Sequence, residues 1–69
     1  MPLLFADLGV EYVVKRVGGK PEMKKHLEDL GFTPGGVVTV VAKNGGNLIV
    51  RVKDSRLALD RELAMKIDI

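Results

Sequence analysis

Hydrophobic positions along this chain repeat at two different spacings, and each spacing predicts a different secondary structure. Within residues 21–30, apolar side chains recur at Met23, Leu27 and Leu30, the i, i+4, i+7 spacing of one helical face. From residue 37 onward, β-branched residues form runs or alternate with polar ones, which is typical of strands. The sequence therefore predicts one helix inserted in a chain of short strands.

Five strands are predicted from apolar runs and from the turn signals between them. They span residues 12–17, 37–43, 48–53, 56–59 and 66–69. In the third strand, Leu48, Val50 and Val52 share one face, which should point inward. The second strand is apolar on both faces, which suits a closed or strongly curled sheet. The segment Asn44-Gly45-Gly46-Asn47 predicts a hairpin turn between them, because its residues tolerate positive φ.

The stretch Leu27-Glu28-Asp29-Leu30-Gly31-Phe32-Thr33-Pro34-Gly35 predicts how the helix ends and how the next strand begins. Gly31 can take the left-handed conformation that closes a helix. Phe32 is then expected to fold back on Leu27, the usual apolar partner in such a cap. The Pro-Gly pair that follows predicts a tight turn, because proline presets φ and glycine accepts a positive φ.

The N-terminal part of the chain is predicted to contribute to the core. Residues 1–9 are expected to be extended, with Phe5 and Leu8 as candidates for burial. In the first strand, Val14 and Val17 are predicted to lie on opposite faces, because side chains alternate along a strand.

Size and composition favour a single domain covering residues 1–69. A chain this short buries only about 60% of its unfolded surface, and without cysteine it has no disulfides to compensate. Asp60 is predicted to cap one helical turn over 61–64. We therefore expect an all-β, SH3-like barrel of about five strands, with one α-helix and one short helical turn. A flat α+β sandwich is the alternative.

The charges divide into a basic part and smaller acidic parts, although the net charge is only +2. Five cations face one acid, Glu22, within residues 15–25. This distribution fits either a mixed, solvated surface or a basic face for an acidic partner or nucleic acid. The chain has no signal-peptide pattern and no apolar run long enough for a membrane helix, so we predict a cytoplasmic protein without membrane insertion.

The residues needed for catalysis are too few to form a mutually placed set, so an enzyme is not predicted. The chain has one histidine and no cysteine, and its candidate hydroxyl nucleophiles, Thr33 and Ser55, fall in predicted turns. On the helix, His26 is four residues from Glu22 and three from Asp29, but two ligands are too few for a closed metal site. Neither a metal nor a cofactor is predicted.

Nucleic-acid binding is also not predicted, because the aromatic stacking platform is missing. The aromatic residues are Phe5, Tyr12 and Phe32. Phe32 is assigned to the helix cap and Phe5 to the core.

The order of these features resembles the FeoA family. Residues 27–35 are similar to the family motif L-x-x-L-G-[apolar]-x-P-G, and they are followed by the β-branched run 37–41. Leu57-Ala58-Leu59 through Ala64 and Ile67 is similar to the family's closing element. An arginine is often found just before the first leucine of the motif, where this chain has His26.

The resemblance implies an SH3-like barrel and an accessory, regulatory role in bacterial ferrous iron uptake. Proteins of this family are thought to bind the cytoplasmic part of the FeoB transporter. Related domains also occur at the C-terminal end of iron-dependent repressors. The alternative is therefore a detached regulator domain that binds a metal, a peptide or nucleic acid.

A partner surface is predicted where the helix end meets the Pro34 turn. Leu27, Leu30 and Phe32 converge there, and Lys24 lies at the rim. Either all three apolar residues belong to the core, or part of this surface stays open as a hydrophobic cleft for a protein partner. The terminal strand 66–69 could also pair with that of a second copy and form a homo-oligomer.

Overall fold

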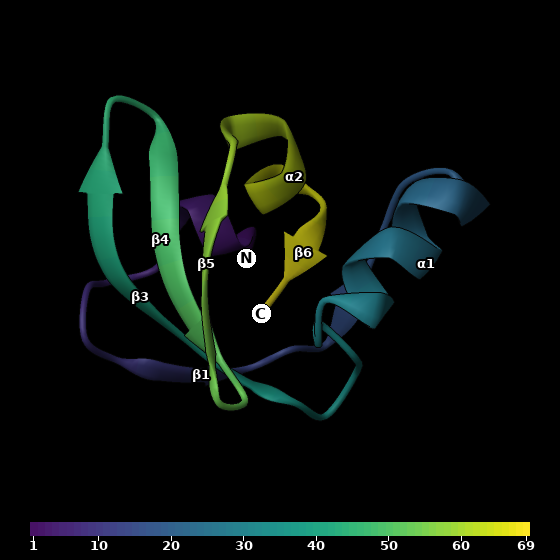
Figure 1. Cartoon of the computed structure of the whole chain (residues 1–69), viewed down its shortest axis with the longest axis horizontal. Coiled ribbons are helices and arrows are strands. Elements are labelled where there is room, and N and C mark those ends of the chain that lie inside the picture. Colours follow the sequence, from purple (N-terminus) through teal and green to yellow (C-terminus); the bar gives the residue numbers. More distant parts are fainter.

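Six strands form two antiparallel sheets in the computed structural model, which describes residues 1–69. The larger sheet has the strand order β1-β3-β4-β5, and the smaller pairs β2 with β6. The strands are β1 (Glu11–Val13), β2 (Arg16–Val17), β3 (Val37–Asn44), β4 (Asn47–Val52), β5 (Ser55–Leu59) and β6 (Ile67–Asp68). Figure 1 shows the long β3–β4 hairpin curving beside β5, with β6 across from it.

Three helical segments complete the fold: the 3-10 turn η1 (Leu3–Phe5), helix α1 (Pro21–Asp29) and helix α2 (Arg61–Met65). Helix α2 connects β5 to β6 and packs on η1, whereas α1 lies at the side of the molecule near β2 (Figure 1). Neither α-helix has the length and apolar composition needed to cross a lipid bilayer.

The two sheets and α2 enclose one cluster of buried apolar side chains. Its members are Leu3, Ala6, Val14, Val17, Leu27, Phe32, Val38, Val40, Leu48, Val50, Val52, Leu59, Ala64, Ile67 and Ile69. The predicted alternation in β4 is confirmed, because Leu48, Val50 and Val52 are buried while Arg51 between them is exposed. The predicted hairpin turn is also confirmed, with positive φ at Gly45 (59°) and Gly46 (93°).

The predicted helix stop is confirmed in detail. Gly31 has a φ of 113°, and its N–H donates to the Glu28 carbonyl at 2.9 Å. The Phe32 N–H donates to the Leu27 carbonyl at 3.0 Å, which completes the pair of bonds of a Schellman cap. Leu27 and Phe32 are both fully buried in the core. The cap therefore fixes the direction in which the chain leaves α1.

Two other local predictions are confirmed. The Gly36 N–H donates to the Thr33 carbonyl at 2.8 Å, and Gly35 between them has a φ of 89°, as a type II Pro-Gly turn requires. Asp60 caps α2, because its carboxylate accepts a hydrogen bond from the Leu63 N–H at 2.9 Å.

The single strand predicted over residues 12–17 is wrong, because the chain changes pairing partner in its middle. The Val14 N–H donates to the Gly36 carbonyl beside β3, and the next N–H, that of Lys15, donates to Asp68 in β6. This change of sheet at residues 14–15 breaks the alternation, so that Val14 and Val17 are both buried. This break divides one expected strand into β1 and β2 and raises the count from five to six.

The predicted burial of Phe5 and Leu8 is also wrong, since their exposed fractions are 59% and 54%. Residues 3–5 form the η1 turn instead of an extended segment. In that turn, residues three apart share a face, so Leu3 and Ala6 enter the core and Phe5 points outward.

The two chain termini meet beside β6. The Met1 ammonium group contacts the Asp68 carboxylate at 2.7 Å, and the Ile69 N–H donates to the Met1 carbonyl at 2.8 Å. Asp68 is also paired with β2 through Arg16. The terminal strand is therefore occupied on both sides, and the predicted route to a homo-oligomer through its free edge is wrong.

We expect Gly31→Ala to lower the free energy of unfolding by about 1–2 kcal/mol, since an L-residue is strained at positive φ. The new Cβ would also lie 3.4 Å from Val52 Cγ2. Urea denaturation measures the change. Gly18→Ala is the matched control, because Gly18 has no positive φ and only an ordinary contact at its Cβ position. Equal losses in both variants would contradict the cap as the cause.

We expect Asp68→Asn to lose stability at neutral pH and to match the parent in acid. The hydrogen bond from the Met1 ammonium group lowers the pKa of Asp68, helped by the charges of that ammonium, Arg16 and Lys15. A carboxylate whose pKa is lower in the folded state than in the unfolded state stabilises the folded protein at pH values above its unfolded-state pKa of about 3.9. This stabilisation is lost as the pH falls through the folded-state pKa. Urea titrations between pH 7 and pH 2 measure this. A stability difference that does not shrink in acid would contradict the ion pair.

Candidate interaction surface

The structure divides the predicted partner residues between the core and the surface. Leu27 and Phe32 are fully buried, with exposed fractions of 0%, and Leu30 is half-buried against the same cluster. Lys24 and Pro34 are exposed. The first of the two readings of this region therefore holds for Leu27 and Phe32, which belong to the core. A partner role for Lys24, Leu30 and Pro34 stays a prediction.

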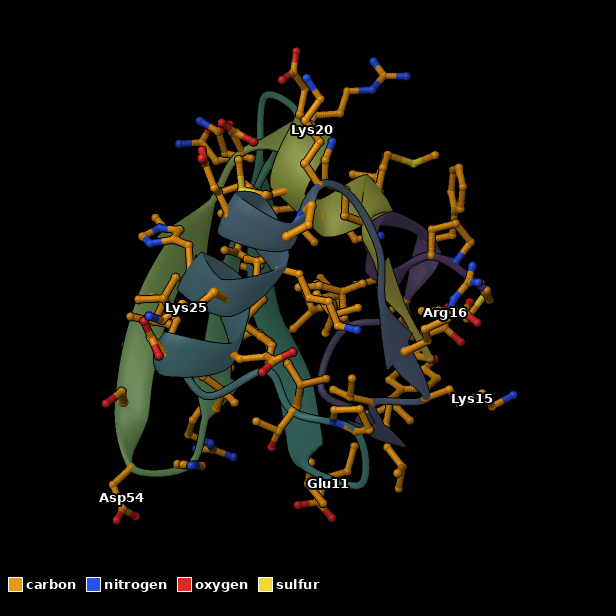
Figure 2. All side chains as sticks on the ribbon, turned by 90° about the vertical axis from the view of Figure 1, so that its right-hand side faces the viewer. Glu11, Lys15, Arg16, Lys20, Lys25 and Asp54 are labelled. Atoms are coloured by element: carbon orange, nitrogen blue, oxygen red, sulfur yellow. The ribbon has the colours of Figure 1, made fainter.

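The basic residues of the first half of the chain do not converge on one site. Figure 2 shows the side chains of Lys15 and Arg16, at the start of β2, on one side of the molecule, and those of Lys20, just before α1, and Lys25, within α1, elsewhere on its surface. The only ion pair of the protein joins the Met1 ammonium group to Asp68. The lysine and arginine side chains are consequently free to meet an external acidic group.

Helix α1 brings two of the three candidate metal ligands together. Glu22 and His26 line one shallow depression with Lys20 and Met23, and Asp29 does not take part. No group of three or more His, Cys, Asp or Glu side chains is placed to hold a metal ion.

No two side chains of the protein are hydrogen-bonded to each other. The hydrogen bonds that involve a side chain or the terminal ammonium group run from the ammonium to Asp68 and Ile69, and from backbone N–H groups to Tyr12 and Asp60. Nucleophilic catalysis needs a nucleophile within hydrogen-bond reach of a base. This structure holds no such pair.

A second depression lies on the outer face of the larger sheet, where β1, β3 and β4 run side by side. It is lined by Glu11, Val37, Thr39, Arg51 and Lys53. Thr39 is the one polar residue among the buried side chains, with an exposed fraction of 5%. Sequence reasoning passed over it, although a lone polar residue within the β-branched run 37–41 was the available signal.

Large apolar side chains are exposed on several elements. They are Met1, Phe5, Leu8, Val10, Val13, Val37 and Met65. Val13 and Val37 are opposite each other in the β1–β3 register, so they form one continuous apolar patch. Val37 also borders the depression described above. This patch joins apolar surface to charged groups, a combination typical of protein-binding surfaces.

Strand β5 leaves one edge of the larger sheet open. Val52 and Ser55 are paired on either side of the two-residue turn Lys53–Asp54. The residues that flank such a turn are hydrogen-bonded to each other, and hydrogen-bonded and non-hydrogen-bonded pairs alternate from there along the two strands. The N–H and C=O groups of Arg56 and Ala58 then point away from β4, and no other segment bonds to them. An open edge of this kind can accept an additional strand.

The geometry defines a class of protein: a small SH3-like barrel with an open strand edge and an exposed apolar patch. Comparison with solved structures confirms the fold. The FeoA of Stenotrophomonas maltophilia, solved in complex with zinc and described as a prokaryotic SH3 domain protein, matches with a TM-score of 0.87 and 31% identity. The match covers 99% of this chain and 87% of that one. An iron uptake regulatory protein (FeoA) matches with a TM-score of 0.88 and 25% identity, over 97% and 91% of the two chains.

The chain belongs to the FeoA family. The FeoA domain model matches residues 1–69. A protein of Methanocaldococcus jannaschii, provisionally named Fe(2+) transport protein A, is 35% identical over 66 residues, which cover 96% of this chain and 80% of that protein. The resemblance first drawn from residues 27–35 and 57–67 is thereby confirmed.

A manganese-dependent transcriptional repressor shares the fold, with a TM-score of 0.86 at 20% identity. Its match covers 97% of this chain and 39% of the repressor. At this identity, the likeness concerns the fold alone.

We expect Leu27→Ala to lower the free energy of unfolding by about 2–5 kcal/mol, because it removes a fully buried side chain. Leu30→Ala removes a half-buried side chain and should cost about 1 kcal/mol. Urea denaturation of both variants measures the difference, with the exposed Lys24→Ala as a control. A loss in Leu27→Ala no larger than in Leu30→Ala would contradict the placement of Leu27 in the core.

Proposed function

We propose that this protein is a cytoplasmic accessory protein of ferrous iron uptake that acts by binding the cytoplasmic part of a FeoB-like transporter. Its membership of the FeoA family over the whole chain carries this proposal. The names of its relatives, an Fe(2+) transport protein A and an iron uptake regulatory protein, support the same process. The protein regulates the transporter by contact, without chemistry of its own.

The surface supports binding to another protein. The exposed Val13–Val37 patch, the open β5 edge and the unpaired cations each offer a feature that a partner can cover. No pair of side chains is arranged as nucleophile and base, so contact with a partner is the simplest way for the protein to act.

The test is binding of the purified protein to the cytoplasmic region of the FeoB-like transporter from the same genome, by calorimetry or interferometry. We expect saturable binding, and we expect cells that lack this chain to take up less radioactive Fe(II). Re-expression should restore uptake. Absence of binding together with unchanged uptake would overturn the proposal.

Generic duplex DNA serves as the control ligand for the alternative, a detached regulator domain that binds nucleic acid. Binding to phosphate groups releases counterions, so a nucleic-acid-binding protein loses affinity steeply as salt is raised. We expect no such binding here. Tight, salt-dependent binding to DNA without binding to the transporter would favour the alternative.

A further inference from the structure

We propose that the depression lined by Glu11, Val37, Thr39, Arg51 and Lys53 binds a carboxylate side chain of the protein partner, with an apolar partner residue beside it on Val13 and Val37. The proposal rests on the proposed function, because it takes the ligand to be part of another protein. It names the surface that this protein uses and the chemistry of the segment that it recognises.

The strand register builds the site from three strands. Glu11 is opposite Thr39, and Thr39 is opposite Arg51, so the three residues form one row across β1, β3 and β4. Neighbouring strands are about 4.8 Å apart, which places the β1 and β4 ends of this row about 10 Å apart. Glu11 and Arg51 form no ion pair with each other. The space between the two charges is open to a ligand.

Thr39 supplies the hydrogen-bonding group at the base of the depression. Thr39 is buried, with an exposed fraction of 5%. Its hydroxyl takes part in none of the protein's side-chain hydrogen bonds. No fully buried polar side-chain atom lacks a partner, so this hydroxyl still reaches solvent in the depression that it lines. A hydroxyl held in this way can donate a hydrogen bond to a carboxylate oxygen.

Lys53 is held at the site at a conformational cost. It is the one residue other than glycine with a positive φ, 53°, and L-residues are strained there by about 1–2 kcal/mol. Glycine or asparagine would suit the position better. Strained residues of this kind are concentrated at functional sites. The lysine contributes an ammonium group that those residues lack.

Charge and size select the occupant. Two cations and one anion line the depression, which leaves one net positive charge. The single charge of a carboxylate balances it, whereas the second charge of a phosphate dianion has no cation left to balance it. The volume of about 230 Å³ is below the range of about 300–1,000 Å³ typical of small-molecule sites. It suits a side chain presented by a partner, and Val13 and Val37 offer apolar contact to the next residue.

The site is tested first with a minimal ligand. The probe is the peptide Val-Glu-Val, acetylated and amidated at its ends, titrated into the isotope-labelled protein and followed by amide NMR shifts. We expect shifts at Thr39, Arg51 and Lys53 with millimolar affinity. The Val-Gln-Val peptide and inorganic phosphate should each bind at least about tenfold more weakly. The Gln side chain lacks the negative charge, and phosphate carries a second negative charge that the site does not balance.

Variants assign the contacts. Thr39→Val keeps the shape of the side chain without the hydroxyl, and Arg51→Gln removes one cation. Each variant should therefore bind the Val-Glu-Val peptide about tenfold more weakly than the parent. Thr39→Ser restores the hydroxyl and should restore binding. Arg61→Gln is the matched control, because Arg61 is exposed on α2, outside the depression and away from the β5 edge. Its affinity should equal that of the parent. Retained amide dispersion verifies that each variant is folded.

The same variants are then measured against the transporter's cytoplasmic region. Weakened binding by Thr39→Val and Arg51→Gln, with Arg61→Gln unchanged, supports the site. Binding by the parent and by all variants alike overturns the site and leaves the proposed function standing. If the parent does not bind the transporter, the proposed function fails, and the peptide titration decides the site. Equal amide shifts with the Val-Glu-Val and Val-Gln-Val peptides overturn the site, and stronger binding of the Val-Glu-Val peptide supports it.

Discussion

The end of helix α1 at Gly31 is the constraint on which the rest of the fold depends. The two hydrogen bonds of the cap turn the chain so that Leu27 and Phe32 enter the same core. The absence of a Cβ at Gly31 matters as well, because Val52 and Lys53 of the β4 end lie against it. One residue therefore joins the inserted helix to the sheet. In a chain of 69 residues, whose total stability is on the order of 3–10 kcal/mol, few such junctions can be lost.

Features that depend on neighbours in the sequence were predictable, and features that depend on distant partners were not. The cap at Gly31, the Gly45-Gly46 hairpin and the Asp60 cap follow from local conformational preferences. The division of strand 12–17 depends on two different pairing partners, β3 and β6, which lie far along the chain. The outward position of Phe5 depends on the η1 turn packing on α2.

The same distinction applies to the interaction surface. The sequence indicates an apolar cluster around Leu27 and Phe32, but apolar residues that converge near a helix end also make the best core, and the structure uses them so. The depression on the larger sheet requires Glu11, Thr39 and Arg51 to be brought into one row by the β1–β3 and β3–β4 registers. A hydrophobicity pattern shows which strands exist, and it does not show which residues meet across them.

The strained turn at Lys53 has a consequence for any attempt to improve this protein. Selection of the chain for heat resistance alone would favour glycine at position 53, because glycine relieves the left-handed backbone. The resulting protein would be sturdier and would carry one cation fewer beside Thr39. Thermal robustness and the proposed recognition of a partner therefore make opposite demands on a single turn of the barrel.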